Sequence, residues 1–288
     1  MKIVAATRAS ALAQWQTNHV AALLAEADGA EVEPLLVSTA GDRDKTTPLH
    51  EIGGKGVFVK EVQAAVLDGR ARIAVHSAKD LPALTPDGLI ICAVPLRADP
   101  RDALVGSRFA DLAEGATVGT GSIRRQVQLL ASRPDLEVVE IRGNIDTRLG
   151  RVGELDAVVM ASAALDRLDL SPDVVERLDV ETMLPQVGQG TLAIECRADD
   201  HEVVEALAKI DNADSHRVLD AERAFLVELG GDCELPAGAY AVLSADGLIE
   251  MKALLSDGNE QVHTDSRSGE DGVAIGRGLA ADLRERLV

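Results

Sequence analysis

Residues 72–82, RIAVHSAKDLP, run from a short apolar stretch into a polar turn that a proline ends. We expect a strand over residues 72–75 and a turn that carries His76, Ser77, Lys79 and Asp80. In open α/β sheets, ligands gather beyond the carboxyl ends of the strands. This turn therefore predicts a site, with Asp80 as the best candidate for a working carboxylate. The alternative is a structural salt bridge between Asp80 and Lys79.

The start of the chain has the same order of strand, polar turn and helix. Residues 2–6 predict a strand, and the turn that follows contains Arg8 and Ser10. Ser10 is a suitable N-cap for a helix in which apolar residues recur at helical spacing; we expect His19, which lies among them, to be packed rather than catalytic. The free N–H groups at a helix start point toward an anion, so this turn predicts an anion site.

A second copy of this arrangement begins at residue 117. Residues 117–119 predict a strand, and Thr120 and Ser122 lie in the turn before a helix. The apolar spacing predicts that Ile123, Val127 and Leu130 form one face of that helix. Its first turn also contains two arginines, where the helix dipole disfavours cations. An anionic ligand would resolve this conflict for Arg124 and Arg125.

These repeats predict two similar α/β halves that face one another across a cleft. Residues 155–163 resemble residues 71–78, and the break at residues 99–102 (DPRD) indicates a crossover into the second half. A glycine-rich segment, residues 185–190, precedes a strand that we expect to return to the first half. A helix, two alternating strands and a last helix then predict a small α+β domain. The expected domains are residues 1–98 with 193–213, residues 99–192, and residues 214–288.

The charge of the chain excludes some classes of partner. The 288 residues carry a formal net charge of −19, which disfavours a nucleic-acid surface or an anionic membrane. No apolar run approaches the roughly 18 residues that span a bilayer, and the N-terminus lacks the apolar region of a signal peptide. We therefore expect a cytoplasmic protein. The basic residues are 22 Arg and 7 Lys, and the planar Arg side chain suits carboxylates and phosphates.

The three cysteines are far apart and form no CxxC pair, which argues against both a disulfide framework and a zinc site. Cys92 and Cys196 lie in apolar, strand-like segments, so we expect them in the core. Cys233 instead lies in a turn, residues 229–238 (LGGDCELPAG), bounded by glycines and a proline. From this segment alone, Cys233 can be a buried filler, a metal ligand or a point of covalent attachment.

The glycine loop GGKGVFVK, residues 53–60, has no P-loop spacing. It is consistent with a lid that carries Lys55 or with a solvated turn.

Taken together, these segments resemble those of the hydroxymethylbilane synthase (porphobilinogen deaminase) family. The resemblance extends over nearly the whole chain and in order. The segments that carry it are ATRAS, GGKGVFVKE, AVHSAKDLP, DPRDAL, GTGSIRRQ, IRGNIDTRL, PQVGQGTLAIECR, AERAF and GGDCELPAG. Single segments such as GGKG are weak signals, but nine in sequence are specific.

The resemblance implies a three-domain enzyme whose first two α/β domains are like type II periplasmic binding proteins. The small third domain carries a cysteine joined by a thioether to a dipyrromethane cofactor. The implied reaction is the condensation of four porphobilinogen molecules, with loss of four ammonia, to hydroxymethylbilane in tetrapyrrole biosynthesis. The resemblance implies no metal and no nucleotide, and it suggests a monomer.

The resemblance also assigns roles to residues of this sequence. Asp80 corresponds to the catalytic carboxylate, which stabilises positive charge on the pyrrole nitrogens. Cys233 corresponds to the attachment residue, although Asp232 stands where the family pattern has Gly, and a carboxylate there disfavours the thiolate. The remaining positions match residues that bind the acidic side chains of cofactor and substrate: Arg8, Ser10, Lys55, Ser77, Lys79, Thr120, Ser122, Arg124, Arg125, Arg142, Arg148, Arg167 and Gly190.

A two-lobed solute-binding or effector-sensing module for a small carboxylate or phosphate is the alternative. It would explain a cleft and the arginines, but it would not require the domain that carries Cys233.

Overall fold

The computed structural model describes residues 1–39, 59–230, 236–258 and 261–287. Lys55, Asp232 and Cys233 therefore lie outside the described residues. The chain divides into two compact units, each made of two segments. The first unit is Met1–Ala98 with Thr191–Leu219, and the second is Asp99–Gly190 with Asp220–Val288.

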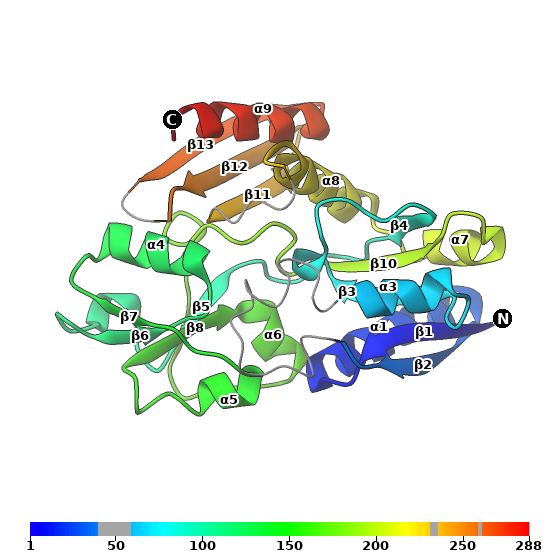
Figure 1. Ribbon diagram of the computed structural model, residues 1–288, viewed down its shortest axis with the longest axis horizontal. Helices are drawn as coiled ribbons and strands as arrows, with labels where there is room; N and C mark the ends of the chain where they lie inside the picture. Colours follow the sequence, from blue (N-terminus) through cyan, green and yellow to red (C-terminus); the bar gives the residue numbers. More distant parts are fainter. Residues whose placement is uncertain (40–58, 231–235, 259–260, 288) are drawn as a thin grey trace. The chain divides into compact units, whose positions relative to one another are not determined.

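The first unit is built on a five-stranded mixed sheet (Figure 1). Four of its strands (β2, β1, β3 and β4) run in the same direction, and β10 is antiparallel to both of its neighbours. The expectation that the strand after the glycine-rich segment returns to the first half is confirmed, because β10 lies between β3 and β4. In spatial order the strands are β2 (Glu31–Val37), β1 (Lys2–Arg8), β3 (Ile73–Ser77), β10 (Leu192–Arg197) and β4 (Leu89–Ala93).

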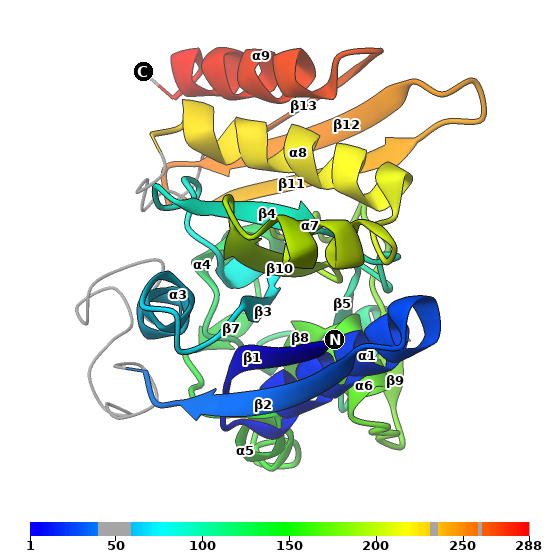
Figure 2. The same ribbon diagram turned by 90° about the vertical axis from the view of Figure 1, so that its right-hand side faces the viewer.

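Helices cover both faces of this sheet because its strands are apolar on both sides (Figure 2). Helices α1 (Ala11–Asp28) and α7 (His201–Ala208) pack on one face, in a core that includes Ile3, Leu24 and Ile194. Helix α3 (Lys60–Leu67) packs on the other face. Cys196 is fully buried in the first of these cores, as expected, while Cys92 is partly buried at its edge.

Helix α1 begins as the sequence predicts. The Ser10 hydroxyl accepts a hydrogen bond from the Ala13 N–H at 3.3 Å, so Ser10 is the N-cap. The buried face of the helix includes two polar side chains, Gln16 and Thr17. His19 is half-buried, and its ring stacks on Trp15 with the ring centroids 5.0 Å apart.

The second unit contains a five-stranded sheet with the same pattern as the first. Its first three strands in spatial order are parallel, and β5 is antiparallel to both of its neighbours. The prediction of two similar α/β halves is therefore confirmed at the level of topology. The spatial order is β7 (Glu137–Val139), β6 (Thr117–Gly119), β8 (Ala157–Ala161), β5 (Asp102–Val105) and β9 (Val175–Arg177).

The C-terminal part of the second unit is a small α+β arrangement, as predicted (Figure 1). An antiparallel sheet of three strands is covered by α9 (Gly272–Glu285), which contacts β12 and β13. The last strand is missing from the sequence prediction, because VHTDSRSG shows no apolar alternation. The strands are β11 (Ala237–Leu243), β12 (Ile249–Ser256) and β13 (Val262–Gly269).

Helix α9 lies very close to α8 (Ala213–Glu228), and glycine makes this approach possible. A Cβ atom at Gly276 would overlap the carbonyl oxygen of Ala221, and one at Gly272 would lie 2.9 Å from the Ala221 Cβ.

Within the described ranges, no helix combines the length and the apolar character that crossing a membrane requires.

Candidate functional site

The polar turns of the first unit meet at one edge of its sheet. Strands β1 and β3 are parallel neighbours, so their carboxyl ends lie at the same edge. A small pocket of about 30 Å³ lies there, and Arg8, Ser77 and Asp80 are among its lining residues. The structure therefore brings together three of the expected site residues of the first unit.

The turn that carries Asp80 is anchored by its buried neighbours. Residues Ala78–Asp80 form one turn of 3₁₀ helix directly after β3. The Ala78 N–H donates to the Thr191 carbonyl at 3.0 Å, and Ala78 and Leu81 are 2 % and 3 % exposed. Asp80 itself is exposed. The backbone that carries the Asp80 carboxylate is therefore anchored, while the carboxylate itself is accessible.

Two further polar residues line this pocket: His76, which lies in the turn that predicts a site, and Gln16, which the sequence analysis does not single out. Gln16 is 4 % exposed, and its Nε2 has no hydrogen-bond partner among the described residues. His76 is 5 % exposed, and its Nε2 lies 3.1 Å from a carboxylate oxygen of Glu195. Gln16 stands three and four residues from the buried Ala13 and Val20, so a helical projection of α1 places it on the inward face.

Of the other expected residues of the first unit that the structure describes, Ser10 and Lys79 are not among the lining residues of the pocket. The Ser10 hydroxyl caps α1, which gives it a structural role. Lys79 is half-buried in the turn beside Asp80. The expectation for Lys55 falls outside the described residues.

In the second unit, Arg124 and Arg125 are ion-paired with a buried carboxylate. Asp102, in β5, is 0 % exposed and accepts from the Arg124 Nη2 at 2.8 Å. It also accepts from the Arg125 Nε and Nη2, at 3.0 and 2.7 Å, and from the Gln189 Nε2 at 2.9 Å. The anion that offsets these cations at the helix start is thus within the chain itself.

Burial and charge act in opposite directions on this cluster. Burial raises the pKa of Asp102, but the guanidinium groups of Arg124 and Arg125 outweigh it and hold that pKa well below its ordinary value. Burial lowers the pKa of Arg124, which Asp102 only partly offsets. Two cations share one anion, so the cluster keeps an excess positive charge. The Arg124 Nε is buried without a hydrogen-bond partner among the described residues.

These ion pairs determine which side of helix α4 (Ile123–Ser132) is buried. Ile123, at one end of the predicted apolar face, is 52 % exposed, while Arg124 and Arg125 are each 5 % exposed. Apolar spacing alone does not show this, because Asp102 binds the two arginines on the inward side.

The hydroxyl groups before α4 differ from the cap of α1. Thr120 is buried, and its Oγ1 accepts from the Ser122 N–H at 3.2 Å. Ser122 is the N-cap by position, but its side chain makes no capping hydrogen bond. The N-terminus of α4 therefore has no side-chain cap, which is the arrangement that favours an anion.

The remaining expected residues of the second unit fall into two groups. Arg167, in α6 (Ser162–Arg167), donates to the Gly190 carbonyl at 2.8 Å, so the structure brings these two together. Burial lowers the pKa of Arg167 to about 10. Arg148 lies in α5 (Ile145–Leu149), and its Nε donates to the Gly143 carbonyl at 2.9 Å. The Arg142 Nε lies 3.5 Å from a carboxylate oxygen of Glu140. Arg142 and Arg148 are partly exposed.

These donors fit a ligand that carries several carboxylates, as a dipyrromethane does. Each unit contains a buried nitrogen without a described partner, the Gln16 Nε2 in the first and the Arg124 Nε in the second. Such groups are costly unless something binds them. In the described part of the chain, no group of three His, Cys, Asp or Glu side chains could hold a metal ion.

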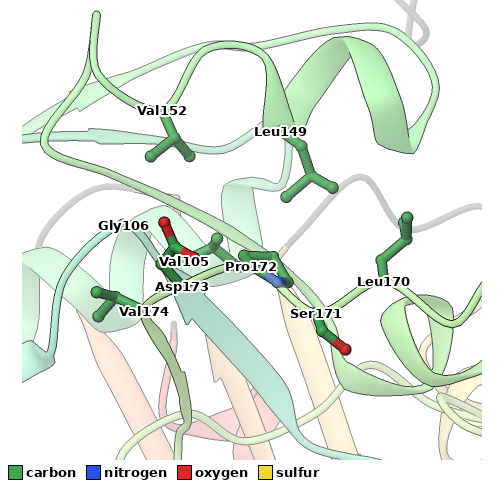
Figure 3. Close-up of a pocket in the computed structure, with 9 residues that line it drawn as sticks. All are labelled: Val105, Gly106, Leu149, Val152, Leu170, Ser171, Pro172, Asp173 and Val174. Atoms are coloured by element: carbon green, nitrogen blue, oxygen red, sulfur yellow. The ribbon is translucent and has the colours of Figure 1, made fainter.

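A larger hollow in the second unit lies apart from the expected residues (Figure 3). Its volume is about 610 Å³, and apolar side chains such as Leu149, Val152 and Leu170 line it together with Asp173. None of the expected site residues is among its lining residues, so size alone does not locate the candidate site.

Comparison with known proteins identifies the family of the chain. Two families match the chain: "Porphobilinogen deaminase, dipyromethane cofactor binding domain" over residues 3–205, and "Porphobilinogen deaminase, C-terminal domain" over residues 217–285. The chain belongs to the porphobilinogen deaminase family. The dipyrromethane cofactor and the transferase class belong to this family, and the match does not favour a solute-binding module.

Similar relatives cover almost the whole chain. Porphobilinogen deaminase of Trichlorobacter lovleyi is 43% identical, over 98% of this chain and 91% of its own length. Those of Brevibacillus brevis and Acidithiobacillus ferrooxidans are 43% and 45% identical, each over 96% of this chain and 92% of its own length.

The solved structures that match are more distant. The methionine binding protein MetQ has a TM-score of 0.45 at 13% identity, over 74% of this chain and 91% of that one. A TRAP periplasmic solute binding protein from Desulfovibrio salexigens has a TM-score of 0.42 at 10% identity, over 73% and 72%.

Proposed function

We propose that the chain is a hydroxymethylbilane synthase, a transferase that condenses four porphobilinogen molecules head to tail with loss of four ammonia. The observation that carries the proposal is the match of both family domains together with the pocket that joins Asp80, Arg8 and Ser77. Porphobilinogen bears an acetate, a propionate and an aminomethyl group on a pyrrole ring. A site for it needs cations for the carboxylates and an anion for the ring nitrogen.

Asp80 is proposed as the anion. When ammonia leaves the aminomethyl group of porphobilinogen, positive charge develops on the pyrrole nitrogen. A carboxylate that accepts the pyrrole N–H stabilises this charge where it forms, and a fixed carboxylate does so without reorganisation. The anchored backbone around Asp80 meets this condition, because Ala78 and Leu81 are buried on either side of it in sequence. Asp80 is also placed to assist proton transfer.

The cations and hydroxyl groups are proposed to bind the acetate and propionate groups. Bidentate contacts from arginine are strong where water is excluded, which gives the buried guanidinium groups an advantage over exposed ones. The proposed residues are Arg8, Ser10, Lys55, Ser77 and Lys79 in the N-terminal segment of the chain, and Thr120, Ser122, Arg124, Arg125, Arg142, Arg148, Arg167 and Gly190 further along it.

Cys233 is proposed to hold the dipyrromethane by a thioether. When bound, this group supplies two linked pyrroles that prime the chain and keep it attached, which replaces a bimolecular encounter by an intramolecular one. The cofactor's four carboxylates would be held by the arginines of the second unit, where the buried Nε of Arg124 is available as a donor.

The location, oligomeric state, partners and domain boundaries of the chain also belong to this proposal. The chain is proposed to act as a cytoplasmic monomer, without nucleic acid or membrane as partner, which its net charge of −19 supports. Residues 214–288 are proposed to be a third domain that carries Cys233. Residues 1–98 with 193–213 and residues 99–192 are proposed as the other two.

The test combines turnover with intact mass. The purified chain is given porphobilinogen, and we expect four ammonia for each hydroxymethylbilane formed. Intact mass is expected to show an adduct of two pyrrole units that Cys233→Ser lacks. An unmodified wild-type chain that binds porphobilinogen or another small carboxylate without consuming it would instead favour the solute-binding module.

A further inference from the structure

A cluster of polar side chains is buried in the first unit beneath the turn that carries Asp80. It consists of Gln63 in α3, His76 in β3 and Glu195 in β10, which are 3 %, 5 % and 0 % exposed. A fully buried carboxylate is costly, so its contacts need an explanation.

The register of the sheet explains how the three side chains meet. In the antiparallel pair, His76 lies opposite Ala193, and Glu195 lies opposite Ala74. His76 and Glu195 are therefore diagonal neighbours on one face of the sheet, the face that α3 covers. The Gln63 Nε2 donates to both carboxylate oxygens of Glu195, at 3.1 and 2.9 Å. The His76 Nε2 lies 3.1 Å from one of them, close enough for an ion pair but without hydrogen-bond geometry.

Stability alone does not account for this cluster. The surrounding core between α3 and the sheet is apolar and includes Val62, Val66 and Ala74. Buried ion pairs and polar clusters contribute little net stability, because desolvation offsets the attraction, and apolar residues of similar volume often stabilise a protein as well or better. What a polar cluster does provide is a fixed arrangement of the elements that it joins.

The elements joined here are those that hold the catalytic turn. His76 directly precedes Ser77 and lines the same pocket as Asp80. Val59, the residue before α3, is 1 % exposed and packs in one cluster with Ala78 and Leu81. The α3 segment is thus linked to this part of the sheet in two ways. Val59, just before α3, packs against Ala78 and Leu81 of the turn, and Gln63 in α3 binds Glu195, which contacts His76 at the end of β3.

We propose that Glu195 and His76 are positioning residues for Asp80. Glu195 holds His76 and α3 in one arrangement, and this arrangement fixes the backbone from which Asp80 projects. The inference rests on the proposed function, because it concerns the carboxylate assigned to catalysis there.

The main test replaces the cluster by apolar residues of similar volume, in the triple variant Gln63→Met, His76→Leu, Glu195→Met. We expect its thermal stability to equal or exceed that of the wild type. We expect kcat to fall about 10- to 100-fold, the effect of a small misplacement of a catalytic group, while KM for porphobilinogen changes less than twofold. The conservative Glu195→Gln is expected to retain more of kcat than Glu195→Ala.

A matched control lies at the other end of β3. Arg72, just before the strand, donates to Asp200 at 2.9 Å. Asp200→Asn also removes a charge, but that charge binds Arg72 at the start of β3, whereas Asp80 follows the end of the strand. We expect Asp200→Asn to lower thermal stability and to leave kcat unchanged.

Amide hydrogen exchange provides a second readout that does not depend on catalysis. Because the Ala78 N–H donates to the Thr191 carbonyl, we expect it to exchange at least tenfold faster in the triple variant. The Arg72 N–H, which donates to the Val4 carbonyl, is expected to be unaffected. A stable triple variant with wild-type kcat and unchanged Ala78 exchange would overturn the inference. If the wild type itself releases no ammonia from porphobilinogen, the proposed function fails. The Ala78 exchange rate in the triple variant, compared with the wild type, still tests whether the cluster holds the backbone of the Asp80 turn.

Discussion

The Arg125 guanidinium donates two hydrogen bonds to a single oxygen of Asp102, from its Nε at 3.0 Å and its Nη2 at 2.7 Å. Its remaining terminal nitrogen donates to the Val159 carbonyl at 3.0 Å. All three nitrogens of this guanidinium thus have partners within the second unit. Arg124 shares the same carboxylate through its Nη2 only. Of the two arginines, Arg124 is the one with a buried nitrogen, Nε, that has no hydrogen-bond partner in the described ranges.

Removing the charge of Asp102 is expected to destabilise the second unit strongly. Asp102→Asn leaves two buried guanidinium groups without their anion, and breaking a buried pair in this way costs about 3–5 kcal/mol. Urea unfolding at pH 7 measures the change. The control is Asp265→Asn, which removes an exposed pair with Arg286, and its effect should be at most about 1 kcal/mol. Equal losses in the two variants would show that the Asp102 cluster contributes no more than a surface pair.

The contribution of Asp102 is expected to depend on pH. Its pKa in the folded chain lies below the ordinary value of 3.8. The ionised carboxylate therefore stabilises the fold above that ordinary value, and the stabilisation is lost as the pH falls toward the folded pKa. We expect the difference in unfolding free energy between the wild type and Asp102→Asn to be full at pH 7 and smaller at pH 3. A difference that grows between pH 5 and pH 3 would contradict the assigned direction of the shift.

Asp80→Ala is expected to abolish turnover without affecting the fold. The side chain is exposed, so its loss should change the unfolding free energy by less than about 0.5 kcal/mol. Loss of a group that stabilises transition-state charge should lower kcat at least about 100-fold. Steady-state kinetics and urea unfolding test the two statements together. Asp87→Ala, at another exposed carboxylate of the same unit, serves as the control and should keep wild-type kcat.

Arg167 is expected to oppose stability while it serves binding. Burial lowers its pKa to about 10, so the charged side chain is less favourable in the folded than in the unfolded chain. Arg167→Met removes this cost and also the hydrogen bond to the Gly190 carbonyl. We expect a melting temperature no lower than that of the wild type, together with reduced turnover. Arg151→Met, at an exposed pair with Glu154, should change neither property appreciably. A marked loss of stability in Arg167→Met would assign this residue a structural role.

The repeated local patterns of the sequence predict much of the fold. Strand, polar turn and helix recur at Ser10 and Ser122, and helix α1 begins where its predicted N-cap, Ser10, indicates. These signals are local, because they depend on alternation, helical spacing and capping. β13 gives no such signal, since its residues are polar and it forms only by pairing with β12.

The candidate site is less predictable because its contacts are non-local. Sequence spacing groups Ile123 with the apolar face of α4, but Ile123 is exposed, because Asp102, more than twenty residues away in the sequence, binds Arg124 on the buried side. Gln16 and Glu195 occupy positions where periodicity indicates core. Nothing in the spacing reveals that Gln16 lines the pocket or that Glu195 contacts Gln63 and His76. The Asp80 turn was predictable, because a strand and the turn that follows it are adjacent in sequence.

The position of β10 has a consequence for synthesis on the ribosome. This strand lies between β3 and β4, yet about a hundred residues separate it from β4 in the chain. Until the nascent polypeptide reaches residue 197, β3 and β4 both expose an unpaired edge, which is a template for aggregation. A fragment that ends at residue 98 would keep those edges permanently. The sheet of the first unit therefore cannot form completely from the N-terminal third of the chain alone. It is completed only when β10, which is translated much later, pairs with β3 and β4.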